Sequence, residues 1–410
     1  GYSGEGRPPM YGDYEAQRHW MELTLALPPR AWYVVGPDND LQYWGLDYPP
    51  VSAYLSWIVG CMARLCDHPE LVALHTSRGH ESEPTRVFMR RSVLACDALV
   101  YLPAAVAAAR AAGPPGSARR LDMLVLLTAL PALLLVDHGH FQYNCVSLGF
   151  ALWAALAAMA GRPLACCVAF SLSLNTKQMG LYLAPAFFCY LLAAALRRPT
   201  PAARLRSLAS LGTVTLGTFA LCWAPFLRDG DWLPVLSRVF PTSRHLYEDK
   251  VANLWCTLAL LPPLKLKALL PIPTLVTLAA TCTLVALLPP CGLLMRRPSR
   301  AAFLLCATAC ALAFFLLSYQ ARDPVVAANL HAAHTLHSTW RRCTRSTSSS
   351  SSSPPHSSRR GRRPSSYGSP ASPPSPCSRS LRATVYACRT PSRRSVNPQH
   401  VPARACVLRC

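Results

Sequence analysis

The chain has 410 residues, of which 51% are hydrophobic and only 15% charged, with 38 prolines and a formal net charge of +22. Soluble globular domains carry about a quarter charged residues, and several apolar runs here approach the length that spans a bilayer. This composition argues against an ordinary soluble domain and predicts an all-α, polytopic membrane protein.

Residues 1–86 are predicted to form a loop region with short helices outside the membrane. The segment Gly12–Trp20 opens an amphipathic helix, and Asp13 stands where a helix cap is expected. From the residues alone, Asp13 is either such a cap or a carboxylate that could accept a proton from a substrate hydroxyl. Val51–Cys66 has an apolar stripe at helical spacing but reaches only about 24 Å, which predicts an interfacial helix.

Residues 87–320 are predicted to form a transmembrane bundle of about eight spans. Each candidate is an apolar run, although three of the eight are short for a bilayer core of about 30 Å. The runs are Val87–Ala109, Leu121–Val136, Cys145–Ala160, Leu164–Leu174, Met179–Leu196, Ser207–Leu227, Pro273–Leu294 and Ala301–Ser318.

Arginines lie in alternate connections between these spans, with no acid among them. Because cytoplasmic loops carry the excess of Lys and Arg, this pattern predicts that the opposite set of loops faces away from the cytoplasm. The opposite set contains the polar segments Asp137–Asn144, Asn175–Gln178 and the stretch Arg228–Leu270, together with the region before the first span. The arginines are Arg110, Arg119, Arg120, Arg162, Arg197, Arg198, Arg204, Arg206, Arg296, Arg297 and Arg300.

Several of these polar segments resemble a known family. The strings Tyr11–Pro50, His75–Ser82, Gly139–Asn144, Lys177–Met179 and Glu248–Cys256 are similar to the dolichyl-phosphate-glucose-dependent α-1,3-glucosyltransferases of asparagine-linked glycosylation. These motifs are most similar to those of the enzymes that add the first glucose. The sister enzymes that add the second glucose remain the alternative. The resemblance covers about residues 2–320.

The resemblance implies a GT-C-type glycosyltransferase of the endoplasmic reticulum membrane with its active face in the lumen. Its partners would be the donor dolichyl-phosphate-glucose, a lipid-linked oligosaccharide acceptor and membrane lipid, with no cofactor. Asp13 matches the family's proposed general base, and Asp47 is a second catalytic candidate. A phosphate leaving group already carries negative charge, so one base and a few cations would suffice, whereas glycosidases need two carboxyl groups.

The remaining candidates for substrate contact lie on the same set of loops. Aromatic side chains there could stack on sugars or sit at the headgroup belt, and Lys177 could hold the phosphate or extend toward the membrane interface. The candidates are Glu15, Arg18, His19, Trp20, Tyr43, Trp44, Tyr48, His140, Gln142, Lys177, Gln178, Arg244, Glu248, Asp249 and Lys250.

Residues 321–410 form a low-complexity tail. From Thr339 to Cys410 there are 14 arginines and no lysine, aspartate or glutamate, and the family resemblance stops just before the tail begins. This composition cannot bury a core. It predicts a disordered or out-of-frame segment on a truncated chain that also lacks its true start, with an inactive relative as the alternative. Binding of RNA or anionic lipid is the alternative, but no aromatic-basic RNA module accompanies the arginines, so no nucleic-acid partner is predicted.

Two further classes are weighed against the enzyme. A transporter would need intramembrane charges along its path, and Asp97 is the main one within a predicted span. A metal site is not expected, because no Cys or His pair with zinc-ligand spacing has a second pair at a suitable distance.

Overall fold

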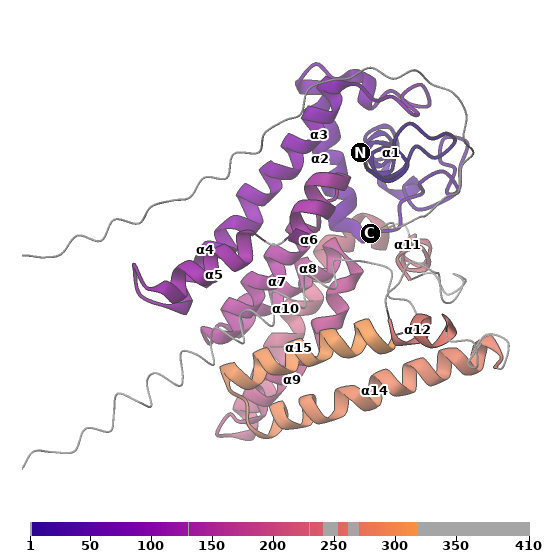
Figure 1. Ribbon diagram of the computed structural model, residues 1–410. Coiled ribbons are helices and arrows are strands. Elements are labelled where there is room, and N and C mark those ends of the chain that lie inside the picture. The colour runs from indigo at the N-terminus through magenta and orange to yellow at the C-terminus, as the bar shows by residue number, and fades with distance from the viewer. Residues whose placement is uncertain (1, 130, 229, 241–252, 261–269, 319–410) are drawn as a thin grey trace, which may run out of the picture. The chain divides into compact units, whose positions relative to one another are not determined.

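The computed structural model describes residues 2–129, 131–228, 230–240, 253–260 and 270–318, all within one compact unit of the chain, Gly1–Ser353. Within these ranges the regular elements are helices, and one isolated β-bridge joins Gly36 and Asn39. The predicted all-α class is therefore confirmed for the described part of the chain (Figure 1). The tail lies outside the described residues.

The N-terminal region contains α1 (Asp13–Ala26), η1 (Pro29–Ala31), α2 (Pro50–Leu65) and η2 (Pro69–Leu71). The residue that caps α1 is Gly12, and the Asp13 side chain makes no capping hydrogen bond. Gly12 has φ 81°, and a Cβ atom there would lie 1.8 Å from the Ser3 carbonyl oxygen, so only glycine fits. The alternative of Asp13 as a helix cap is therefore wrong, and its carboxylate is available for another contact.

The helix predicted over Val51–Cys66 forms as α2, but its buried face is the one with small residues. Ser52, Ser56 and Gly60 are buried, whereas Ile58 and Leu65 of the apolar stripe are 47% and 83% exposed. The reason is close packing, because a Cβ on Gly60 would lie 3.2 Å from the Met21 carbonyl oxygen of α1. Ile58, Met62 and Leu65 of the apolar stripe thus face outward, as expected of an interfacial helix, whereas Val59 of the same stripe is buried.

The rest of the described chain supplies the bundle. Five segments are long and apolar enough to cross a membrane: Glu83–Ala112, Gln178–Leu196, Pro201–Arg228, Pro273–Arg296 and Arg300–Leu317. The helices are α3 (Glu83–Cys96), η3 (Asp97–Tyr101), α4 (Leu102–Ala112), α5 (Ala118–Thr128), α6 (Pro131–Leu133), η4 (Leu134–His138), α7 (Asn144–Met159), α8 (Pro163–Thr176), η5 (Gln178–Leu183), α9 (Ala184–Leu196), α10 (Pro201–Arg228), α11 (Trp232–Val239), α12 (Leu254–Leu260), α14 (Ile272–Arg296) and α15 (Arg300–Leu317).

The other three predicted spans are helical but short. The run Leu121–Val136 is divided among α5, α6 and η4, and α7 and α8 have 16 and 14 residues. At 1.5 Å per residue these two reach about 24 and 21 Å, which is less than a bilayer core of about 30 Å. They pack against each other, and α7 is largely buried. Among the described residues, five segments rather than eight are therefore long and apolar enough to cross a membrane.

Polar contacts hold the N-terminal region against one end of the bundle. Ser52 Oγ donates to the Thr176 carbonyl oxygen at 2.5 Å, and Tyr54 donates to the Cys222 carbonyl oxygen at 2.8 Å. At the Arg-bearing end, Arg197 donates to the Met295 and Arg296 carbonyl oxygens and so joins the end of α9 to the end of α14. Segments far apart in the sequence, such as α2 and the end of α8, are thereby brought together. They meet at the end of the bundle next to α1, which lies beside α2 in Figure 1.

Candidate active site

Asp13 and His140 meet at the first turn of α1. Oδ2 of Asp13 lies 2.7 Å from Nδ1 of His140, and the two side chains are 29% and 36% exposed. Because a carboxylate only accepts hydrogen bonds, His140 donates from Nδ1. Both side chains remain open to a ligand, and the histidine fixes the direction of the carboxylate.

Lys177 is buried in the interior of the protein. Its Nζ donates to Asn144 Oδ1 at 2.6 Å, and it lies 4.8 Å from the centre of the Tyr48 ring. The Lys177 side chain is buried, so its charge needs partners other than water. The described contacts place it inside the protein rather than at a lipid interface.

The Asp137 carboxylate positions the Asn144 side chain through a hydrogen bond. Asn144 Nδ2 donates to Asp137 Oδ1 at 2.6 Å, and the Cys145 amide donates to the other carboxylate oxygen at 2.7 Å. Burial raises the pKa of Asp137 to about 6, although these hydrogen bonds and the charge of Lys177 oppose that shift. Asp137, Asn144 and Lys177 therefore form one buried network, called the lysine network below.

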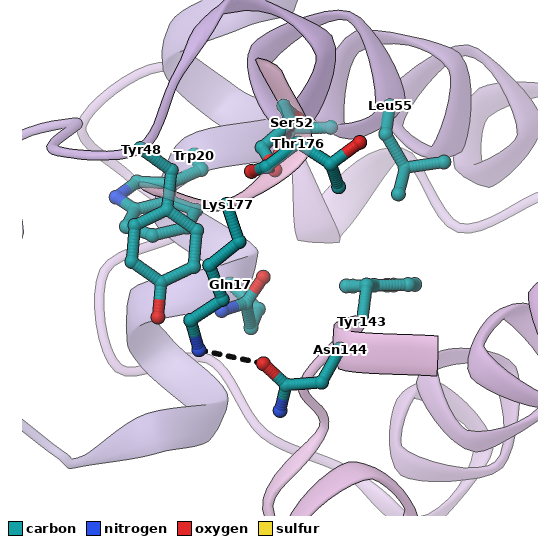
Figure 2. A pocket seen from close by; sticks show the side chains of 10 residues that line it. Gln17, Trp20, Tyr48, Ser52, Leu55, Tyr143, Asn144, Thr176 and Lys177 are labelled. Atoms are coloured by element: carbon teal, nitrogen blue, oxygen red, sulfur yellow. Dashed lines mark hydrogen bonds between the residues drawn. The ribbon is translucent and has the colours of Figure 1, made fainter. Parts of the chain in front are cut away.

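A small pocket opens beside the lysine network (Figure 2). Lys177 extends between Tyr48 and Asn144, with Gln17 and Trp20 of α1 on the same wall. The space open to the centre of a water molecule is about 20 Å³, which holds about one water. Gln17 follows Asp13 by one helical turn, so the pocket and the Asp13 carboxylate share one face of α1. A sugar would have to occupy the surface above the pocket rather than its interior.

Two further predicted residues lie at the edge of this pocket. Tyr48 packs edge-on against Trp20, with ring centroids 4.9 Å apart. Gln178 donates from Nε2 toward the backbone carbonyl oxygens of Asp47 and Val239, each at 3.4 Å. Asp47 is partly buried and precedes Tyr48, so the loop that carries it borders the same pocket.

Glu15 and Arg18 form a separate cluster on another face of α1, called the arginine cluster below. Arg18 Nε and Nη2 donate to the two Glu15 carboxylate oxygens at 2.7 Å each, and Nη2 also donates to Glu22 at 2.7 Å. Nη1 donates to the Leu71 carbonyl oxygen at 2.9 Å and to Ser77 Oγ. All three charged side chains are buried, and these contacts fasten α1 to the loop of residues 71–78. Direct substrate contact by Glu15 and Arg18 stays a prediction.

The electrostatics of the arginine cluster differ from those of the lysine network. Burial raises the pKa of Glu22, but hydrogen bonds from His19, Arg18 and the His75 amide and the Arg18 charge outweigh it and lower this pKa to about 2. Contact with Glu15 and Glu22 raises the pKa of Arg18 despite its burial. Arg18 and Glu22 therefore stay charged across the ordinary pH range.

Four other predicted residues pack around these two groups. Tyr43 donates to Glu15 Oε1 at 2.7 Å, and its ring contacts His19 with centroids 5.0 Å apart. Trp44 donates to the Met10 carbonyl oxygen at 2.6 Å. Gln142 Oε1 accepts from Asn144 Nδ2 at 3.1 Å, which adds it to the lysine network. The predicted residues Arg244, Glu248, Asp249 and Lys250 lie outside the described residues.

Sequence reasoning did not select Gln17, Asp137 or Asn144. Asp137 and Asn144 stand at the two ends of a polar segment between apolar runs. A carboxylate at the edge of an apolar run is the signal that could have identified them, because buried carboxylates such as Asp137 concentrate at functional sites. Gln17 lies inside the family motif Tyr11–Pro50, but nothing in its spacing distinguishes it from a surface residue.

Thiols gather elsewhere in the bundle. The Cys306 Sγ atom lies 3.9 Å from that of Cys291 and 3.8 Å from that of Cys310, and such a group could hold a thiophilic metal ion. These cysteines lie within α14 and α15, so they do not take part in the site around Asp13. The expectation of no metal stays a prediction.

Comparison with known proteins shows which proteins this chain is similar to. The chain is 45% identical over 323 residues to the "Dolichyl pyrophosphate Man9GlcNAc2 alpha-1,3-glucosyltransferase" of Gallus gallus, a match that covers 78% of this chain and 63% of the relative. It is 42% identical over 355 residues to a "Probable dolichyl pyrophosphate Man9GlcNAc2 alpha-1,3-glucosyltransferase" of Arabidopsis thaliana, covering 83% and 65% of the two chains. The chain thus spans less than two thirds of the length of these relatives. Residues 7–323 match the model of the "ALG6, ALG8 glycosyltransferase family", and the chain belongs to that family.

Proposed function

We propose that this protein transfers glucose from dolichyl-phosphate-glucose to the terminal mannose of a lipid-linked high-mannose oligosaccharide. The linkage would be α-1,3, formed with inversion, as the first glucose added in N-glycosylation. Family membership and the names of the relatives support the reaction class. The observation that carries the proposal is the partly exposed Asp13 carboxylate, aimed by His140 at 2.7 Å.

The proposed chemistry is a single displacement. Asp13 accepts the proton of the mannose 3-hydroxyl while that oxygen attacks C1 of the glucose. The bond between C1 and the phosphate oxygen breaks, and its electron pair leaves with the dolichyl phosphate. Attack from the face opposite the phosphate converts a β-linked donor into an α-linked product. The leaving group needs no proton, so a second carboxyl acid is not required.

Lys177 is proposed to stabilise the phosphate charge. Its position beside Tyr48 and Asn144 puts a fixed cation on the wall of the pocket that borders α1. A preorganised cation in a water-poor site stabilises developing negative charge more than it would in bulk water. Asp47 stays the second candidate for the catalytic carboxylate, and Trp20, Tyr48 and Gln178 are proposed to contact the sugars, because they lie at or beside the same pocket.

The location follows from the same proposal. We infer an endoplasmic reticulum membrane protein with a luminal active face, in which the three short helical runs complete eight membrane passages. The alternating arginines support this sidedness. Addition of the second glucose is the alternative activity, and a truncated, inactive relative is the alternative state. Membership of a glycosyltransferase family sets the transporter hypothesis aside.

The test is transfer of labelled glucose in microsomes that contain the full chain. Microsomes receive dolichyl-phosphate-glucose and either unglucosylated or monoglucosylated lipid-linked oligosaccharide, which separates the first from the second glucose. Asp13→Asn is expected to lower the rate by about 10²- to 10⁴-fold. Asp40→Asn is the matched control, because Asp40 is an exposed carboxylate of the same region whose hydrogen bond to the Gln42 amide an asparagine can keep. Transfer that survives in Asp13→Asn would remove Asp13 as the base, and no transfer by the unaltered chain would overturn the activity.

A further inference from the structure

A second cavity lies at the Arg-bearing ends of the helices. It opens to the surface between the end of α7, the start of α8 and the end of α9, and Ala158 and Arg198 line it. The space open to the centre of a water molecule is about 360 Å³, far more than beside Lys177. Along α7, Ala158 is 14 residues from Asn144, a rise of about 21 Å. The cavity is therefore distinct from the candidate active site.

The rim of this cavity is cationic. Arg197 and Arg198 line it, and both side chains are exposed. Arg162 precedes α8 at the same turn as the lining residue Pro163. The sequence has no aspartate or glutamate between Asp137 and Asp229, so α7, α8, α9 and α10 offer no acid to neutralise these arginines. The rim thus favours an anionic ligand.

The inner wall is apolar and rigid. Tyr190, Leu191 and Ala194 of α9 line it, and the Tyr190 ring packs against Phe303 of α15 with centroids 4.9 Å apart. Arg197 is fixed by its bonds to the ends of α9 and α14. The apolar wall continues along the candidate membrane span Gln178–Leu196, and arginines form the rim. These two parts match the acyl chains and the anionic headgroup of a phospholipid, whereas a free ion would need only the arginines.

We propose that this cavity binds the phosphate headgroup of an anionic membrane lipid. Arg198 and Arg197 meet the phosphate, and the first turn of α8 adds its partial positive charge. The acyl chains lie along Leu191 and Ala194 of α9. This binding is independent of glucose transfer, because its residues do not overlap with those around Asp13.

The experiment is native mass spectrometry of the full chain in detergent, titrated with phosphatidylserine or phosphatidylcholine. Arg198→Gln is expected to weaken phosphatidylserine retention about fivefold and to leave phosphatidylcholine retention unchanged. Arg110→Gln is the matched control, since Arg110 is an exposed arginine near the end of α4 that does not line the cavity. It removes the same charge and is expected to retain phosphatidylserine as the unaltered chain does.

Three results would overturn the proposal. Equal retention by Arg198→Gln and Arg110→Gln would show general charge attraction only. Equal affinity of the unaltered chain for both lipids would show that the headgroup charge is not recognised. Displacement of bound phosphatidylserine by equimolar inorganic phosphate would identify a small-anion site rather than a lipid site. Circular dichroism of both variants checks that neither has lost helical structure.

Discussion

The arginine cluster and the lysine network are two buried charged groups packed close to α1. They shift the pKa values of their carboxyl groups in opposite directions. In the first, Arg18 serves both Glu15 and Glu22, and the pKa of Glu22 falls to about 2. In the second, burial of Asp137 outweighs its hydrogen bonds and the charge of Lys177, and its pKa rises to about 6.

The difference indicates separate tasks. A carboxylate with a lowered pKa stabilises the folded state when ionised, which suits a group that fastens α1 to the loop of residues 71–78. A carboxylate with a raised pKa costs stability at neutral pH, and such groups concentrate at functional sites. Asp137 is therefore the better candidate for a residue retained because it positions Asn144 and Lys177.

The largest expected effect is on stability, from Arg18→Met. This change leaves Glu15 and Glu22 buried without their cation and should lower the free energy of unfolding by about 3–5 kcal/mol. Denaturant unfolding in mixed micelles measures it, with Arg64→Met, an exposed arginine of α2, as the control. Equal loss in both variants would contradict the structural role of the cluster.

The next effect is a pH dependence that distinguishes the two groups. Because the Asp137 pKa is raised, its stabilising contribution is complete below about pH 4 and is lost as the pH rises through 6. The unaltered chain should therefore lose about 3 kcal/mol over this window relative to Asp137→Asn. Because the Glu22 pKa is lowered, the contribution of Glu22 is complete above about pH 4.5 and is lost progressively as the pH falls from there through 2. Unfolding measured for both Asp137→Asn and Glu22→Gln from pH 3 to 7.5 tests these signs, and coincident profiles would refute them.

Lys177→Met is expected to act on catalysis more than on stability. Loss of a fixed cation beside the phosphate should lower the transfer rate about 100-fold. The folded amount should fall less than in Arg18→Met, because Asp137 can take up a proton when the nearby cation is removed. Lys177→Arg should recover part of the rate. A variant without activity loss would exclude Lys177 from the donor site.

The smallest effect is expected from Tyr43→Phe, which removes one hydrogen bond to Glu15. The free energy of unfolding should fall by about 1 kcal/mol, since Arg18 still satisfies the same carboxylate. The transfer rate should be unchanged if Tyr43 belongs to the arginine cluster alone. A selective loss of rate would instead support the predicted sugar contact.

The helical class and the grouping of polar loops were predictable because apolar length and arginine position are properties of the sequence itself. Contacts such as those of Asp13 with His140 and of Lys177 with Asn144 were not, because their register depends on how separate helices pack. The family motifs did bring Asp13, His140 and Lys177 onto one set of candidate loops. Spacing predicted an interfacial helix at α2 but not its packing against α1, since the close approach of Gly60 to Met21 is a tertiary contact.

The exposed apolar stripe of α2 also bears on the distance between the Asp13 carboxylate and the membrane. With α1 fastened to the opposite side of α2, Asp13 belongs to the same rigid unit as Trp57, Ile58, Met62 and Leu65. If that stripe rests among lipid headgroups, the carboxylate is kept at a constant height above the hydrocarbon. A sugar attached to a membrane lipid is held at a similarly fixed height. The Asp13 carboxylate and the reacting hydroxyl would therefore meet by diffusion in two dimensions, parallel to the membrane.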